Sequence, residues 1–276
     1  MSTDFLRDMA QASRERVRRA RAQCDDQALR TLAHAAPEPP PLQLSPLGFD
    51  LIAEVKLRSP AVGKLEQARD DIAARARDYA AAGAAAISVL TEPSRFDGEL
   101  AHLEQAARAL GASVPAMRKD FLVDPYQVHE ARLAGAGGVL VILRMLEPDQ
   151  INALLEAAAE LRLFVLLEAF DAPDLEVAHV LVREYGARIK LLVGVNCRDL
   201  STLQVVPGRL EALAPGLPEG VPCVAESGVE SAADAERLAA AGYHLALVGS
   251  ALMRAGDRVA LTRSLLAAGR QGRRCG

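Results

Sequence analysis

The chain has 276 residues, a length that allows one or two domains. Its formal net charge of −4 argues against a protein whose main partner is nucleic acid. The chain does not open with basic residues followed by an apolar core, and it has no apolar run long enough to cross a bilayer. We therefore expect neither a secretory signal nor a membrane partner.

Residues 1–47 predict an N-terminal helical extension. The stretch 4–32 has a helical pattern rich in arginine, and the proline-rich stretch 37–41 then ends any helix. Acidic residues are mixed with the arginines, among them Glu15 and Asp25. We interpret the extension as a solvated helix packed on the following domain rather than as an arm that binds nucleic acid.

Short apolar runs recur through the rest of the chain, each made mostly of Val, Ile, Leu and Ala. They cover residues 49–56, 84–90, 114–119, 138–143, 163–168, 190–196, 222–226 and 245–249. Runs without strict alternation are typical of strands buried on both faces in a parallel sheet. Helical patterns lie between them, such as 72–82 and 232–241, and a glycine follows each as expected at a helix C-terminus.

The alternation of strand, helix and glycine, repeated eight times over about 200 residues, is the period of a (β/α)8 barrel. No linker interrupts the repeat between Asp50 and Ala268. We therefore predict an α/β fold, with a (β/α)8 TIM barrel as the catalytic domain over residues 48–276 and the helical extension over residues 1–47.

Ionisable side chains stand at the ends of several runs. They are Glu54, Lys56, Lys119, Glu168 and Glu226, joined by Asn196 and by Arg198 just beyond it. Because barrel active sites are built at the C-terminal ends of the strands, we expect these groups to meet at one rim. Such crowding should lower lysine pKa values and raise glutamate pKa values, as acid–base catalysis near neutral pH requires.

Glu54 and Lys56 are two residues apart on one strand, so they face the same side of the sheet. Burying either charge alone is unfavourable, and we expect each to pair with the other or with a charge from another strand. For these two residues taken alone, a purely structural ion pair is the alternative to a catalytic role.

Two turns of small residues follow the seventh and eighth runs, at Ser227-Gly228 and Gly249-Ser250. Barrels commonly bind a phosphate at this place, with backbone N–H groups and a short extra helix. Residues 251–254 are the candidate for that helix. The two turns together predict a small phosphorylated substrate, and the absence of GxGxxG and Walker sequences argues against a nucleotide.

No two cysteines form a CxxC pair; they stand at positions 24, 197, 223 and 275. This spacing indicates neither a zinc site nor a disulfide framework. It favours a reducing, cytoplasmic setting. None of the five histidines falls at a strand end, so we expect no metal site. For the same reason Cys197 lacks a partner base, and we interpret it as a buried or incidental cysteine rather than a catalytic one.

Motifs in order and at matching spacing, from about Asp50 to Met253, resemble the indole-3-glycerol phosphate synthase family. They are Ile52-Ala-Glu-Val-Lys-x-x-Ser-Pro60, Ile87-Ser-Val-Leu-Thr-Glu92 with Phe96-x-Gly98, Arg118-Lys-Asp-Phe121 with Asp124-Pro-Tyr-Gln127, Asn196-x-Arg-Asp-Leu200, Ala225-Glu-Ser-Gly228 and Val248-Gly-x-x-Leu-Met253. The resemblance implies conversion of 1-(2-carboxyphenylamino)-1-deoxyribulose 5-phosphate into indole-3-glycerol phosphate, with release of carbon dioxide and water and without cofactor or metal.

The resemblance also implies roles for individual residues. Lys119 is the expected acid at the ribulose carbonyl, while Lys56 and Glu168 serve the elimination of water and Glu54 holds Lys56; how the two lysines divide the acid steps is left open. Asn196 and Glu226 match network residues that orient substrate hydroxyls. The expected substrate-binding residues are Ser59, Ser227, Gly228, Gly249 and Ser250 for the phosphate, Arg198 at the rim, and Phe96, Phe121 and Leu200 as walls for the anthranilate ring.

Several positions depart from the family pattern, namely Ala61, Glu99, Phe170 and Cys197. None is an expected acid or base. These departures leave open the alternative that the chain is a paralogous synthase of a specialised indole pathway. Another phosphosugar barrel enzyme, such as phosphoribosylanthranilate isomerase, is a further alternative, although the pair of lysines argues against it. The last alternative is a barrel without catalytic activity that serves as a binding or assembly partner. For any of these we expect a monomer or a weak homo-oligomer.

Overall fold

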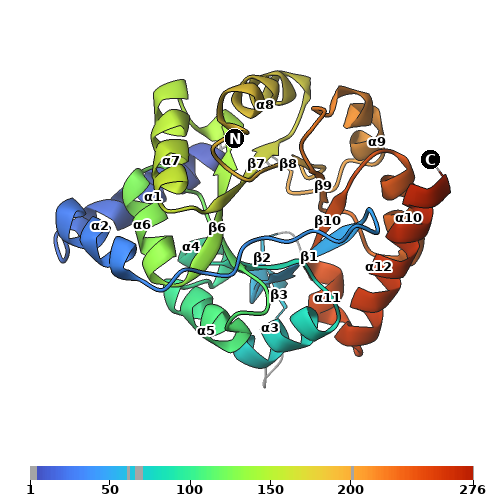
Figure 1. Ribbon diagram of the computed structural model, residues 1–276, viewed down its shortest axis with the longest axis horizontal. Coiled ribbons are helices and arrows are strands. Elements are labelled where there is room, and N and C mark those ends of the chain that lie inside the picture. Colours follow the sequence, from blue (N-terminus) through green and yellow to red (C-terminus); the bar gives the residue numbers. More distant parts are fainter. Residues whose placement is uncertain (1–4, 61–62, 66–70, 200–201, 276) are drawn as a thin grey trace.

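The computed structural model describes residues 5–60, 63–65, 71–199 and 202–275, and it confirms the barrel. Eight parallel strands close in the order β1-β10-β9-β8-β7-β6-β5-β4 (Figure 1). The strands are β1 Asp50–Val55, β4 Ala86–Leu90, β5 Ala116–Lys119, β6 Ala136–Ile142, β7 Phe164–Ala169, β8 Leu191–Asn196, β9 Cys223–Glu226 and β10 Leu245–Val248. Each falls on one of the apolar runs, since only runs buried on both faces can line a closed parallel sheet.

Helices surround the barrel on its outside (Figure 1). They are α3 Ile72–Ala81, α4 Pro93–Phe96, α5 Leu100–Leu110, α6 Pro125–Leu133, α7 Pro148–Glu160, α8 Ala172–Tyr185, α9 Arg209–Leu213, α10 Ala232–Ala240, α11 Ser250–Arg254 and α12 Arg258–Cys275, with 3-10 turns η1 Leu143–Met145 and η2 Ala214–Gly216. Side chains cap several N-termini: Asp71 accepts hydrogen bonds from the backbone of α3, and Ser231 does the same for α10. The two helices expected at 72–82 and 232–241 are confirmed.

The N-terminal segment differs in one respect from the expected single helix. It forms two, α1 Phe5–Arg21 and α2 Asp26–Ala35, because Asp25 caps the second with its side chain. Helix α2 lies beside α6 on the outside of the barrel (Figure 1), whereas Leu6 and Met9 of α1 pack in the apolar cluster that includes Phe121 and Ile142. The apolar face of α1 is buried, including Met9 and Val17, so this face packs on the barrel while the opposite face is solvated.

A small antiparallel hairpin, β2 Arg58–Ser59 with β3 Gly63–Lys64, follows β1. The apolar pattern did not predict it, since strands of two residues carry no periodicity.

The interior of the barrel is packed with alternate residues of the strands, such as Ile52, Met117, Leu166 and Val224. Residues two positions further along, such as Glu54, Lys119, Glu168 and Glu226, occupy the next layer, at the C-terminal ends of their strands. The alternation of side chains along the strands therefore places a layer of packed apolar residues beneath a layer of charged residues. Within the described residues, no helix is both long enough and apolar enough to span a membrane.

Candidate active site

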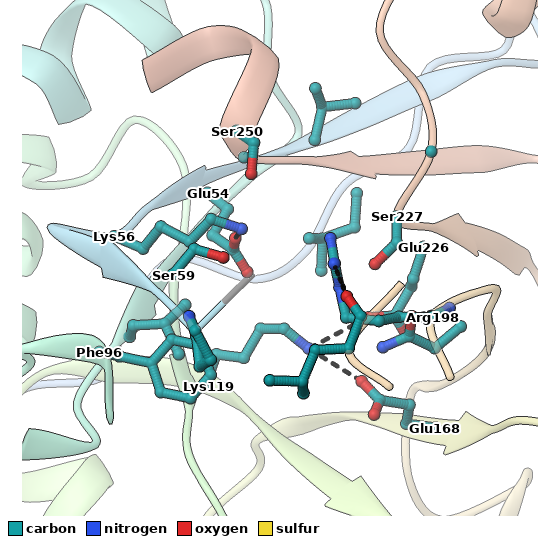
Figure 2. Close-up of a pocket in the computed structure, with 18 of the residues that line it drawn as sticks. Glu54, Lys56, Ser59, Phe96, Lys119, Glu168, Arg198, Glu226, Ser227 and Ser250 are labelled. Atoms are coloured by element: carbon teal, nitrogen blue, oxygen red, sulfur yellow. Dashed lines mark hydrogen bonds and ion pairs between the residues drawn. The ribbon is translucent and has the colours of Figure 1, made fainter. Parts of the chain in front are cut away.

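A cavity of about 320 Å³ opens at the C-terminal ends of the strands (Figure 2). The predicted catalytic residues Glu54, Lys56, Lys119, Glu168, Asn196 and Glu226 all line it, as do Ser59, Phe96, Phe121, Arg198, Ser227, Gly228, Gly249 and Ser250. Two positions of the sequence-based interpretation, Leu200 and Ala61, lie outside the described residues. The strand polarity of the barrel thus brings these residues, which follow or end seven of the eight strands, to one cavity.

Lys56 and Glu54 form an ion pair, with 2.6 Å between Nζ and Oε1. Glu54 is buried. Burial acts to raise its pKa, but the charges of Lys56 and Lys119 outweigh it and hold the pKa of Glu54 below its ordinary value. A Cβ at Gly249 would stand 2.2 Å from Glu54 Oε1 and 3.0 Å from Lys56 Nζ. Glycine at the end of β10 therefore leaves the space that this pair occupies.

Lys119 lies between two carboxylates from other strands. Its Nζ is 2.9 Å from Glu168 Oε2 on β7 and 3.1 Å from Glu226 Oε2 on β9 (Figure 2). Burial acts to lower the pKa of Lys119, but Glu168, Glu226 and Glu54 outweigh it and raise the pKa above the ordinary lysine value. The expectation of lowered lysine pKa values is therefore wrong for Lys119, because paired carboxylates at hydrogen-bonding distance favour the charged form.

Glu226 has the opposite environment. Burial, together with the neighbouring Glu168, raises the pKa of Glu226 to about 8, although Lys119 acts to lower it. Its Oε1 has no hydrogen-bond partner within the described structure, and a Cβ at Gly194 would stand 2.0 Å from this oxygen. The expected raised glutamate pKa thus holds for Glu226 and fails for Glu54. The raised pKa favours the protonated form of Glu226.

Asn196 and Arg198 shape the loop after β8. The Asn196 Oδ1 accepts a hydrogen bond from the backbone N–H of Arg198 at 3.0 Å. The Arg198 guanidinium donates to the carbonyl of Leu203 at 2.5 Å, and Arg198 forms an isolated bridge with Val205. Asn196 is buried and lines the cavity.

The turn after β9 has an unusual backbone. Ser227 and Gly228 both have positive φ, 67° and 73°, and both line the cavity. The Cys197 thiol donates to the carbonyl of Ser227 at 3.3 Å, and burial raises the pKa of Cys197. The prediction that Cys197 is buried is confirmed. The expected short helix after β10 is present as α11.

The far wall of the cavity is aromatic. Phe96 and Phe121 lie 6.1 Å apart between ring centroids, and Phe5 meets Phe121 edge to face at 5.8 Å. Phe5 and Leu6 belong to α1 and line the cavity, so the extension contributes directly to the site. The sequence interpretation missed this contribution. The apolar spacing of α1 marks its buried face but does not reveal which part of the barrel that face covers.

Asp120, directly after Lys119, was also missed. It is buried and accepts hydrogen bonds from both terminal nitrogens of Arg16 on α1, at 2.9 and 2.7 Å, from Arg118 at 3.1 Å and from Thr91 at 2.8 Å. Burial acts to raise the pKa of Asp120, but Arg118 and Arg16 outweigh it and keep the pKa far below its ordinary value. This network ties α1 to the strand end that carries Lys119.

The departure at Phe170 has a structural explanation. Phe170 is buried, and the Arg144 guanidinium lies over its ring at 4.7 Å from the centroid. Arg144 also pairs with Asp174 at 2.7 Å. Phe170 therefore packs in the same apolar cluster as Phe121 and Ile142, at the mouth of the barrel interior. In the parts of the chain that the structure describes, no group of three or more His, Cys, Asp or Glu side chains has an arrangement that would hold a metal ion.

Comparison with known proteins agrees with this geometry. The family model described as indole-3-glycerol phosphate synthase matches residues 6–265. The chain is 44% identical to the indole-3-glycerol phosphate synthase of Leifsonia xyli, over 92% of this chain and 95% of that protein, and 40% identical to the one of Micrococcus luteus, over 95% and 97%. Among solved structures, 3-hexulose-6-phosphate synthase from Salmonella typhimurium superposes with a TM-score of 0.62 at 17% identity, covering 81% of this chain and 99% of that one, a likeness that shows the fold alone.

Proposed function

The chain belongs to the indole-3-glycerol phosphate synthase family, carboxy-lyases of tryptophan biosynthesis, and we propose how its own residues carry that reaction. The substrate is 1-(2-carboxyphenylamino)-1-deoxyribulose 5-phosphate, and the products are indole-3-glycerol phosphate, carbon dioxide and water. The observation that carries the proposal is the position of Lys119, a buried ammonium between Glu168 and Glu226 on the floor of a cavity with an aromatic wall. The family match argues against phosphoribosylanthranilate isomerase as the activity.

Ring closure needs an acid. The aromatic carbon that bears the carboxylate attacks the ribulose carbonyl carbon, and negative charge develops on the carbonyl oxygen. The raised pKa of Lys119 keeps its ammonium fully protonated at neutral pH, so a proton is available at every turnover. The developing alkoxide is strongly basic and can take this proton, whereas the ground-state carbonyl cannot. Lys119 thereby stabilises the transition state more than the substrate.

The later steps restore the benzene ring and then make the new five-membered ring aromatic. Breaking the bond to the carboxylate releases carbon dioxide and returns its electron pair to the benzene ring. Loss of the new hydroxyl as water then forms the indole, which requires one acid for the departing oxygen and one base for the remaining proton. We assign the acid role to Lys56, whose Nζ lies 2.6 Å from Glu54 Oε1, and the base role to Glu168.

The two ends of the substrate have different surroundings. Phe96 and Phe121 offer an apolar slot for the anthranilate ring, and Phe5 closes its outer side. Ser227 and Ser250 lie at the other end of the cavity in Figure 2, where the turns after β9 and β10 supply backbone groups for the phosphate. Ser59 on β2 adds a hydroxyl. Asn196, Arg198 and Glu226 also line the cavity, and we assign to them the orientation of the ribulose hydroxyls.

We infer a small phosphorylated molecule as the partner and no role for nucleic acid or membrane. Each proton transfer is assigned to a lysine or a glutamate, so the proposed reaction uses neither cofactor nor metal. A monomer or weak homo-oligomer in the cytoplasm completes the proposal.

Steady-state kinetics of Lys119→Met test the assignment of the acid. Methionine keeps the packing of the lysine stem and removes the proton, so kcat should fall by about 10²–10⁴-fold with little change in KM. Lys190→Met is the matched control, since Lys190 is exposed and precedes β8 at the opposite end of the barrel. Full turnover by folded Lys119→Met would remove Lys119 from the acid role.

A further inference from the structure

The phosphate end of the cavity has an unbalanced charge. Its expected ligands are hydroxyls and backbone groups, yet a phosphate monoester carries about −1.5 to −2 charge at neutral pH. The two lysines that line the described cavity are already engaged, Lys56 by Glu54 at 2.6 Å and Lys119 by Glu168 and Glu226. The Arg198 guanidinium donates to a backbone carbonyl. Phosphate binding in a cup that also holds carboxylates therefore calls for a further cation.

Arg254 is in position to supply it. It lines the cavity and is the last residue of α11, four positions after Ser250. Residues four apart lie on the same face of a helix, and helical side chains lean toward the N-terminus of their helix. The Arg254 side chain thus extends on the face of α11 that carries Ser250, one of the expected phosphate ligands. Its side chain is 45% exposed, so it has room to change rotamer.

Arg254 has a weak partner in the structure. Its Nη2 lies 3.2 Å from Oε1 of Glu230, which is 65% exposed and also lines the cavity. Glu230 follows the turn at Ser227-Gly228 by two residues, so the pair bridges the two turns expected to hold the phosphate. An exposed ion pair of this kind contributes little, whereas an arginine and a phosphate form bidentate, charge-assisted hydrogen bonds. Exchange of Glu230 for phosphate is therefore favourable.

We propose that Arg254 binds the substrate phosphate, and that Glu230 holds the guanidinium at the cavity mouth until the phosphate replaces it. The identity of the substrate rests on the proposed function, but recognition of a phosphate by Arg254 does not. In this arrangement Glu230 competes with the phosphate, which lowers affinity and speeds the departure of the phosphorylated product.

Two variants with opposite expected effects test the proposal. We measure the phosphate Kd by calorimetric titration with inorganic phosphate, and the KM and kcat by steady-state kinetics with the full substrate. Both experiments use Arg254→Met, Arg254→Lys and Glu230→Gln. Loss of a partly exposed, charge-assisted contact in Arg254→Met should raise both the phosphate Kd and the KM by about 5- to 30-fold, with kcat little changed. Arg254→Lys should recover part of the loss, and Glu230→Gln should lower both constants. Arg188→Met is the control, because Arg188 forms a comparably exposed pair with Glu156 away from the cavity.

A merely structural tether between the two turns gives a different pattern. In that case Arg254→Met and Glu230→Gln both raise the phosphate Kd and KM, and the proposal is overturned. Unchanged constants in Arg254→Met, with thermal unfolding like that of the wild type, also overturn it. Because the phosphate titration needs no turnover, a wild type that binds phosphate through Arg254 but forms no indole would contradict the proposed function and leave this inference standing.

Discussion

Substitution of Asp120 by asparagine should destabilise the protein strongly. Asp120 is the anion at the centre of the network that joins α1 to the end of β5, and it faces the guanidinium groups of Arg16 and Arg118 at 2.7 and 3.1 Å. Asparagine preserves the shape and one acceptor oxygen but removes the charge. The variant therefore leaves two cations directed at an amide that also presents donors of its own.

The size of this loss of stability follows from how deeply the two ion pairs are buried. Removing one partner of a buried ion pair typically costs about 3–5 kcal/mol. The side chain of Arg118 is 4% exposed and falls in this class, whereas that of Arg16 is 25% exposed and is partly screened by solvent. We expect the free energy of unfolding at pH 7 to fall by about 3 kcal/mol, near the lower end of the range.

The pH dependence gives a second signature. The folded-state pKa of Asp120 lies below its ordinary value of 3.8, so its ionised form stabilises the fold above that value. This contribution is lost as the pH falls from 3.8 toward the folded-state pKa. The difference in unfolding free energy between wild type and Asp120→Asn should therefore be constant near neutrality and shrink in acid.

Urea unfolding at a series of pH values measures both effects, with Asp78→Asn as the matched control. Asp78 pairs with Arg258 at 2.8 Å, but both side chains are 30–40% exposed, so this loss should stay below about 1 kcal/mol. A similarly small loss for Asp120→Asn, or a difference that does not change with pH, would refute the network as a source of stability.

Three other predictions concern the cavity. Gly228→Asp should raise the KM and the inhibition constant for inorganic phosphate, because Gly228 has a φ of 73° and a carboxylate there repels the phosphate; unchanged values in a folded variant would move the phosphate site elsewhere. Incubation with EDTA followed by dialysis should leave the rate unchanged, since every proton transfer is assigned to a lysine or glutamate, and a loss restored by a divalent ion would count against the proposed chemistry. Glu226 binds its proton more tightly in the folded state, with a pKa of about 8, than in the unfolded state, where the pKa is near 4.5, so its contribution to stability is lost as pH rises between these values. The variant Glu226→Gln should flatten this decline in thermal unfolding measured over a series of pH values. An equally steep decline in the variant would show that Glu226 is ionised.

The sequence predicted the rim because strand polarity carries most of the information. Each apolar run fixes a strand, and a parallel barrel brings all C-terminal strand ends to one side, so Lys119, Glu168 and Glu226 had to meet there. The pair Glu54 and Lys56 follows from the two-residue repeat of a strand. Neither conclusion needed knowledge of side-chain contacts.

The direction of the pKa shifts could not be predicted in the same way. Whether a buried lysine is raised or lowered depends on whether carboxylates lie at about 3 Å or further away, and only the structure gives those distances for Lys119. The contributions of Phe5 and Asp120 depend on contacts between segments more than a hundred residues apart. A helical pattern identifies the buried face of α1 but not the strand end that it covers.

The release of the substrate carboxylate tests the central claim most directly. The wild-type protein is incubated with 1-(2-carboxyphenylamino)-1-deoxyribulose 5-phosphate labelled with ¹³C in the carboxylate, while indole fluorescence and labelled carbon dioxide are followed together. The account predicts that one labelled carbon dioxide appears for each indole formed. Folded protein that forms no indole, or that forms indole without labelled carbon dioxide, would contradict it.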